Sequence, residues 1–199
     1  MLTAADPNES VSYFQRAVSD DPDRIDHLRG LASSLVRAKR STEAVGAWQQ
    51  VTRHPDATDI DRVDLADANI RANNWKEAEA VLDRIPPTHE TYKRYRLEAM
   101  IADSNREWKK ADSFYETAAG MTTKPTGVMN NWGYSKLMRG ESKSAERLFG
   151  DAIRQDQQLF TQRTTWSSRG ARNAITSFPS SLWIKQSALS CFTPLVFRL

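Results

Sequence analysis

The sequence contains few of the residues that form disulfide frameworks, metal clusters and membrane spans. It has one cysteine, Cys191, among 199 residues, which excludes an internal disulfide and a cysteine-based metal cluster. No stretch approaches the ~20 consecutive apolar residues of a transmembrane helix. The N-terminus has neither a basic start nor an apolar run, so no signal peptide is predicted and the cytoplasm is the default expectation. A periplasmic or membrane-tethered location is the alternative if the N-terminus is truncated.

Catalytic and cofactor-binding motifs are missing as well. His27, His54 and His89 lie far apart in the sequence, and none has a cysteine or serine companion at a suggestive spacing. The sequence has no glycine-rich phosphate loop, no HExxH and no CxxC. A zinc site needs about four close ligands, and no clustering supplies them. The sequence therefore predicts no catalytic residue, no metal site, no cofactor and no small-molecule substrate.

Acidic residues are absent beyond Asp156, although the chain has 25 of them. Residues 161–199 therefore carry a net charge of +5, whereas residues 1–160 carry −2. The basic character belongs to this C-terminal tail and does not indicate that the rest of the chain binds nucleic acid. The tail is also rich in serine, and three interpretations of it remain open. It is a degenerate capping helix followed by coil, a basic partner-binding extension, or non-native coding such as a shifted reading frame. We favour the third interpretation.

What the sequence does contain is a period of about 34 residues. Four alanines recur at intervals of 34, 33 and 34, and two further series advance at the same stride. Small residues let helix backbones approach one another, and large residues fill the space beside them. Such a period predicts antiparallel helical hairpins stacked as a solenoid. The three series are Ala44, Ala78, Ala111 and Ala145; Phe14, Trp48, Leu82, Tyr115 and Phe149; and Ala17, Val51, Ile85, Ala118 and Ala152.

These residues resemble the tetratricopeptide repeat (TPR) family over roughly residues 8–156. The resemblance implies an all-α fold, an α-α superhelix of about four full repeats preceded by an N-terminal half repeat. The repeat domain is accordingly predicted at 8–160. It follows a terminal segment at 1–7 that is predicted to be disordered, and it precedes the atypical tail at 161–199. The most complete unit contains Leu28, Leu31, Ala32, Leu35, Ala44, Trp48, Val51 and Pro55.

The repeat pattern also predicts the individual helices. A helix at 10–19 forms the half repeat, and Pro86-Pro87 ends the second hairpin. Trp48 is predicted to lie in the core, while Trp75 and Trp108 are predicted to brace hairpin turns. The predicted hairpins are 24–38 with 41–53, 58–72 with 75–85, 89–104 with 108–120, and 126–139 with 142–156.

The family resemblance places the candidate binding surface on the concave groove formed by the first helix of each hairpin. This surface is mixed in sign and suits an extended peptide or a helix as the partner. The alternative is that these residues are ordinary solvated helix faces. The predicted groove residues are Arg29, Ser33, Arg37, Asp64, Asp67, Arg71, Lys93, Arg96, Met100, Asn130, Asn131, Tyr134 and Met138.

The sequence thus predicts a non-catalytic scaffold or adaptor that binds a protein partner. Asn131-Trp132-Gly133-Tyr134 and the two Trp-Lys-x-Ala turns are similar to bacterial TPR proteins of Flp (tight-adherence) pilus assembly. This narrower resemblance implies a role in pilus or secretion assembly. Two other functions remain open: a binder of nucleic acid or an anionic surface through the basic tail, and the repeat domain of a larger enzyme.

Overall fold

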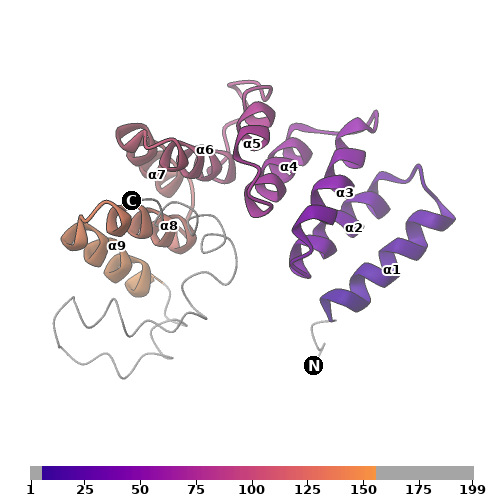
Figure 1. Ribbon diagram of the computed structural model, residues 1–199, viewed down its shortest axis with the longest axis horizontal. Helices are drawn as coiled ribbons and strands as arrows, with labels where there is room; N and C mark the ends of the chain where they lie inside the picture. The colour runs from indigo at the N-terminus through magenta and orange to yellow at the C-terminus, as the bar shows by residue number, and fades with distance from the viewer. Residues whose placement is uncertain (1–5, 156–199) are drawn as a thin grey trace, which may run out of the picture. The chain divides into compact units, whose positions relative to one another are not determined.

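The fold is given by a computed structural model, which describes residues 6–155. Over these residues the chain forms nine α-helices and no strand, so the predicted all-α class of helical hairpins is confirmed (Figure 1). The described residues divide between His89 and Glu90 into two compact units. We call residues 6–89 unit 1 and residues 90–155 unit 2. The predicted tail at 161–199 and residues 1–5 lie outside the described residues.

Unit 1 contains the predicted half repeat and the first two hairpins. Neighbouring helices pack in sequence order, each against the next. The first helix begins three residues earlier than the predicted Ser10, because the Asp6 carboxylate accepts the Asn8 backbone N–H at 3.0 Å and Pro7 suits the first helical position. The helices are α1 (Pro7–Asp20), α2 (Ile25–Arg37), α3 (Ser41–Arg53), α4 (Asp59–Arg71) and α5 (Trp75–Leu82).

Unit 2 contains the third and fourth hairpins. The two helices of each hairpin pack against each other, and the first helix of the fourth hairpin also contacts both helices of the third. This extra contact brings polar side chains of three helices together, as described below. The helices are α6 (Tyr92–Ser104), α7 (Trp108–Gly120), α8 (Thr126–Met138) and α9 (Ser142–Gln155).

Two further helix ends lie three residues from their predicted positions. Helix α5 ends at Leu82 and not at Ile85. Pro86 disfavours helical geometry at the residue directly before it, so Ile85 cannot continue the helix. Ile85 nevertheless stays buried outside the helix. Helix α6 begins at Tyr92 and not at residue 89, because the Thr91 hydroxyl accepts the Arg94 backbone N–H at 3.3 Å and caps the helix there.

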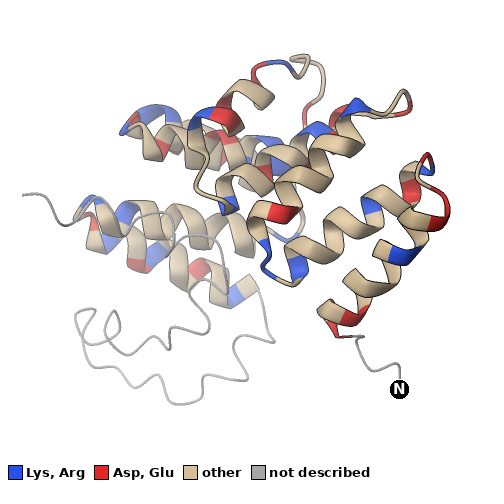
Figure 2. Cartoon of the chain, turned by 45° about the vertical axis from the view of Figure 1, so that its right-hand side comes forward, with Lys and Arg blue, Asp and Glu red and all other residues tan. Residues whose placement is uncertain are grey.

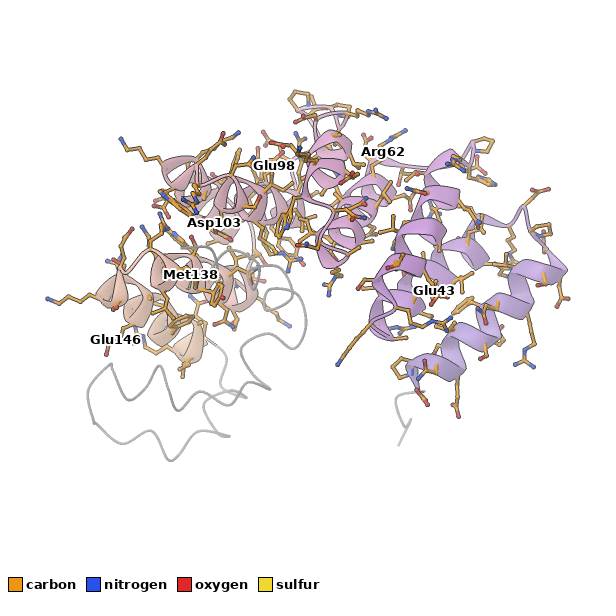
Figure 3. The ribbon with its side chains drawn as sticks, in the orientation of Figure 1. Glu43, Arg62, Glu98, Asp103, Met138 and Glu146 are labelled. Atoms are coloured by element: carbon orange, nitrogen blue, oxygen red, sulfur yellow. The ribbon has the colours of Figure 1, made fainter. Side chains whose placement is uncertain are left out.

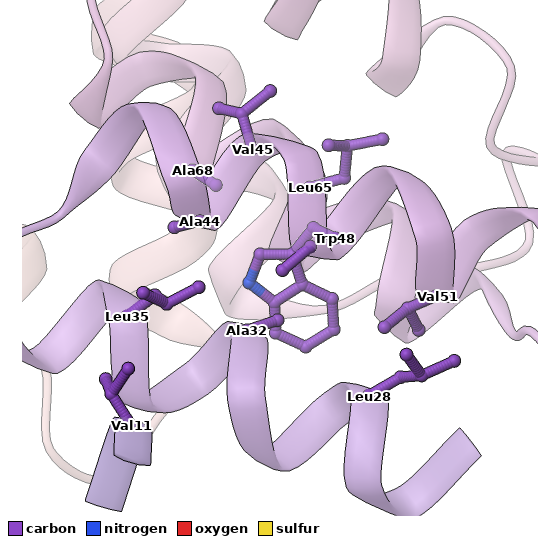
Figure 4. Close-up of a cluster of buried hydrophobic side chains, with 11 residues drawn as sticks. Val11, Leu28, Ala32, Leu35, Ala44, Val45, Trp48, Val51, Leu65 and Ala68 are labelled. Carbon is purple, nitrogen blue, oxygen red and sulfur yellow. The ribbon is translucent and has the colours of Figure 1, made fainter. Parts of the chain in front are cut away.

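The core confirms the predicted repeat register. The alanines at 44, 78, 111 and 145 are all buried, with at most 1% of their surface exposed. Trp48 is 4% exposed and belongs to a cluster of apolar side chains from α1 to α4. Figure 4 shows its indole ring beside Ala32 of α2. In unit 2 a methyl group on Gly133 would lie 2.7 Å from the Phe149 ring, so α8 and α9 approach as closely as the sequence pattern indicated.

All four hairpins turn through a residue in the left-handed region. These residues have φ angles of 61° to 78° and recur at the repeat interval. At each turn the backbone N–H of the following residue donates to a carbonyl five residues earlier, as from Arg40 to Leu35 at 3.0 Å. This is the Schellman arrangement that closes helix C-termini, in which glycine is preferred. The four residues are Lys39, Asn73, Arg106 and Gly140.

Lys39→Gly is therefore expected to stabilise unit 1. The left-handed conformation costs a residue with a side chain about 1–2 kcal/mol, and glycine avoids this cost. The greater freedom of glycine in the unfolded chain offsets part of the gain. We expect the free energy of unfolding to rise by about 0.5–1 kcal/mol, measured by urea denaturation. The matched control is Gln50→Gly in the exposed interior of α3, which should lower it by about 1 kcal/mol. A loss of stability in Lys39→Gly would contradict the assigned turn.

Candidate functional site

In unit 1 the predicted surface residues lie on α2 and α4. Arg29 is held by Asp61 through a bidentate ion pair, with Nε–Oδ1 at 2.8 Å and Nη2–Oδ2 at 2.7 Å. Asp61 also accepts the backbone N–H and the hydroxyl of Thr58, which closes a capping box at the start of α4. Burial opposes ionisation of Asp61, but the hydrogen bonds from Arg29 and Thr58 outweigh it and hold the pKa of Asp61 below 3.8. Arg29 therefore joins two hairpins, and its charge is already neutralised.

The other predicted residues of unit 1 differ in accessibility. Ser33 and Arg37 are exposed, and the Arg37 guanidinium donates to the Ser34 hydroxyl at 3.0 Å. Asp64 and Arg71 are half-buried, whereas Asp67 is only 8% exposed. Arg71 pairs with Asp67 along the same helix, with Nε–Oδ2 at 3.1 Å. The α2 residues thus leave more surface for a partner than the Asp67–Arg71 pair of α4.

In unit 2 the structure brings two predicted residues into contact across neighbouring helices. The Asn131 side-chain amide of α8 lies 3.4 Å from the Met100 sulfur of α6. Met100 is 9% exposed, whereas Met138 at the end of α8 is 43% exposed (Figure 3). The remaining predicted residues are half-buried. We call the whole set the α6–α8 surface: Lys93, Arg96, Met100, Asn130, Asn131, Tyr134 and Met138.

Close to this surface lies a network centred on Asp112 that the sequence analysis did not predict. The Asp112 carboxylate of α7 accepts hydrogen bonds from three side chains, two of α8 and one of its C-cap residue, Arg139. Trp132 donates from Nε1 at 2.7 Å, Lys136 from Nζ at 2.8 Å, and Arg139 from Nη2 at 2.7 Å with a second contact from Nη1 at 3.2 Å. Burial opposes ionisation of Asp112, but these donors outweigh it and lower its pKa to about 2. The network fastens α8 to α7.

Arg139 is the most enclosed cation of this network. Its side chain is 8% exposed, and its guanidinium lies 5.3 Å from the centre of the Trp108 ring, within cation–π range. Glu141 adds a second carboxylate, 3.0 Å from Lys136 Nζ and 3.7 Å from Arg139 Nη1.

The predicted role of Trp75 as a turn brace is confirmed, since its Nε1–H donates to Asn73, the left-handed turn residue, at 2.8 Å. Trp108 instead contacts Arg139, the residue before the turn of the next hairpin.

A second carboxylate, Asp103 at the end of α6, is 4% exposed. Its Oδ1 accepts the Ser135 hydroxyl of α8 at 2.6 Å, and its Oδ2 accepts the Tyr115 hydroxyl of α7 at 3.0 Å. Burial raises the pKa of Asp103 above 3.8. Burial and the neighbouring Asp103 raise the pKa of Tyr115 well above 10. Asp103 thus links three helices through hydroxyl groups.

The histidine and acidic side chains of the described residues form no cluster typical of a metal centre. Among residues 6–155 no three His, Cys, Asp or Glu side chains come together as metal ligands would. Two histidines contact the backbone: His27 Nδ1 lies 3.0 Å from the Ala17 carbonyl, and His54 Nε2 lies 2.9 Å from the Asp23 carbonyl. In the same part of the chain, every helix is too short or too polar to cross a bilayer.

Comparison with known proteins adds to this description. No protein-family model matches the chain, and no curated protein matches its sequence. Solved structures of TPR proteins do match. They include TTC0263, a thermophilic TPR protein of Thermus thermophilus (TM-score 0.67, 14% identity, covering 85% of this chain and 91% of that one) and MamA from residue 41 onward of Desulfovibrio magneticus RS-1 (0.61, 14%, 81% and 89%). A third is YrrB, a TPR protein with an unusual peptide-binding site (0.55, 14%, 85% and 84%). At these identities the likeness shows a shared fold.

Proposed function

We propose that this chain, which has the tetratricopeptide-repeat fold, is a non-catalytic scaffold that binds a partner protein on the first helices of its hairpins. The observation that carries the proposal is the contact between Met100 of α6 and Asn131 of α8. It supports one continuous surface over both first helices of unit 2. Solenoid proteins of this kind bind their partners through such faces.

The chemistry of the α6–α8 surface favours a peptide or a helix as the partner. Asn130 and Asn131 carry amides that donate and accept hydrogen bonds, and both are half-buried. Met138 is exposed and flexible, so it can adapt to apolar side chains of different shapes. Lys93 and Arg96 add positive charge on α6, which favours carboxylates in the partner.

The distribution of charge favours a protein partner over nucleic acid. Basic and acidic residues are interspersed along the helices (Figure 2), whereas nucleic-acid binders gather basic residues on one face. The alternative binder through the basic tail depends on residues 161–199, which lie outside the described residues. A more specific role, in pilus or secretion assembly, is supported by the short sequence resemblance alone.

Affinity capture with the full chain tests the proposal. We expect a variant carrying Asn130→Ala, Asn131→Ala and Tyr134→Ala to lose at least tenfold of the partner recovered by the wild type, since it lacks the polar contacts that fix a bound backbone. The matched control is Glu146→Ala with Arg147→Ala, two exposed residues of α9 whose removal leaves the net charge unchanged.

Both variants must unfold at a temperature close to that of the wild type for the comparison to hold. Equal recovery of every partner by the surface variant and the wild type would overturn the proposal. Deletion of residues 161–199 separates the two binding modes. A scaffold keeps its partner without the tail, whereas a tail-dependent binder loses its ligand and weakens steeply with salt.

A further inference from the structure

We propose that Asp103 is a protonation-controlled link between α6 and α8 that sets the relative position of Met100 and Asn131. It is therefore a positioning residue for the α6–α8 surface. Its effect on partner binding rests on the proposed function, whereas the link itself is a property of unit 2 alone.

Two contacts join α6 to α8 side by side. The first is the 3.4 Å contact between Met100 and Asn131, and the second is the 2.6 Å hydrogen bond between Asp103 and Ser135. Asp103 lies three residues after Met100, and Ser135 lies four residues after Asn131, so both pairs occupy neighbouring turns of the same helix faces. A change in the second contact is therefore transmitted to the first over a single helical turn.

Protonation changes the hydrogen bonds that Asp103 makes, of which the second contact is one. When Asp103 is ionised, both of its oxygens accept hydrogen bonds, one from Ser135 and one from Tyr115. A protonated carboxyl carries one O–H group that must donate. One hydroxyl then has to turn from donor to acceptor. No other hydrogen-bond partner of the Asp103 carboxyl group occurs within residues 6–155, so the two hydroxyls take up the whole change.

The charged groups that face Asp103 come from α7 and the C-terminal end of α8. Arg139, the C-cap residue of α8, favours the ionised form, and Asp112 of α7 disfavours it. Arg139 is hydrogen-bonded to Asp112, so most of its charge is already compensated there. Tyr115 of α7 and Ser135 of α8 supply neutral donors. Burial is the largest influence and raises the pKa of Asp103 above 3.8.

The direction of the pH dependence follows from this shift. Because the folded chain holds the proton more tightly than the unfolded chain, protonation of Asp103 favours the folded unit. The contribution of Asp103 to stability is full below 3.8 and is lost as the pH rises through its folded pKa. Asp103 therefore stabilises the folded unit most in acidic solution, below 3.8.

Nuclear magnetic resonance of the full chain tests the inference without any partner. In the wild type we expect the Met100 methyl and the Asn131 side-chain amide to shift with one common midpoint above pH 3.8, while the exposed Met121 methyl serves as the internal reference. Asp103→Asn should abolish this shift, since asparagine does not titrate. The matched control is Glu98→Gln, a carboxylate on the same helix paired with Arg94 at 2.9 Å, which should leave the shift intact.

A second variant keeps the inference testable if Asp103→Asn does not fold. Ser135→Ala removes the α8 end of the link and leaves Asp103 in place, so the Asn131 amide should no longer follow the titration. The inference is overturned if the Asn131 shift persists in Asp103→Asn or in Ser135→Ala, or if the wild type shows no midpoint above pH 3.8. Because no partner is present in this experiment, its result does not depend on the capture experiment. The two proposals are therefore tested independently.

Discussion

Trp48→Ala is expected to lower the free energy of unfolding of unit 1 by about 3–5 kcal/mol, the usual loss when a large buried aromatic is truncated. Trp48 is 4% exposed and contributes to a cluster that joins α2, α3 and α4. Its neighbours in this cluster include Ala32, Ala44 and Ala68, which are completely buried (Figure 4). Small side chains on rigid helices cannot move into the space left by an indole ring, so the cavity stays open.

Urea denaturation followed by circular dichroism measures this loss, because the helical signal survives removal of the tryptophan. The matched control is Trp75→Ala, which removes the same side chain from a half-buried turn position. It gives up the hydrogen bond to Asn73, and we expect a smaller loss of about 1 kcal/mol. Equal losses in both variants would contradict the repeat register, since the register separates a core position from a turn position.

The sequence was sufficient to predict the hairpins because every repeat has the same physical requirement. A buried alanine such as Ala78 is needed wherever two helix backbones approach, and a large residue such as Trp48 is needed wherever they diverge. These requirements recur at a fixed interval. A single position gives only a weak signal, and the matching positions of the other repeats strengthen it. Helix ends follow from local chemistry and are less regular, as the early end of α5 before Pro86 shows.

The polar networks could not be predicted in the same way. Asp103 and Asp112 do not belong to the three repeating series. Their partners lie 12 to 32 residues away, on or next to other helices. In the sequence, an aspartate within a helix looks the same whether it faces water or a buried hydroxyl. Arg29 illustrates the converse. Its repeat position predicts a residue available to a partner, yet its guanidinium is occupied by the bidentate pair with Asp61 of the same unit.

This distinction matters for the candidate site, because a charged side chain that is already paired contributes little to a partner. Arg29 and Arg71 are bonded to carboxylates of their own unit. The residues that leave hydrogen-bonding or apolar capacity for a partner are the half-buried Asn130 amide and the exposed Met138 thioether of the α6–α8 surface. This surface also borders Asp103 and Asp112, so the strength of those networks determines how firmly it is held.

Asp112→Ala is expected to lower the free energy of unfolding of unit 2 by about 3 kcal/mol. Removal of one partner from a fully buried ion pair costs ~3–5 kcal/mol, and the 28% exposure of the Asp112 side chain places the expected loss at the lower end. The variant leaves Arg139, which is 8% exposed, and Lys136, which is 14% exposed, without their shared acceptor. It also leaves the Trp132 N–H without its acceptor.

The matched control is Asp151→Ala, which removes the same side chain from a pair with Arg154 on the surface of α9. Exposed pairs of this kind contribute about 0.2–1 kcal/mol, so the control should change little.

The pH dependence gives an independent measurement. Because the pKa of Asp112 is lowered to about 2 from 3.8, its contribution is present above 3.8 and is lost as the pH falls through about 2. Urea denaturation between pH 7 and pH 2 should therefore show the wild type losing more stability than Asp112→Ala, with the two curves converging at the acidic end. If the curves stayed parallel, Asp112 would not be the charge that fastens α8 to α7, and the α6–α8 surface would depend on Asp103 and apolar packing alone.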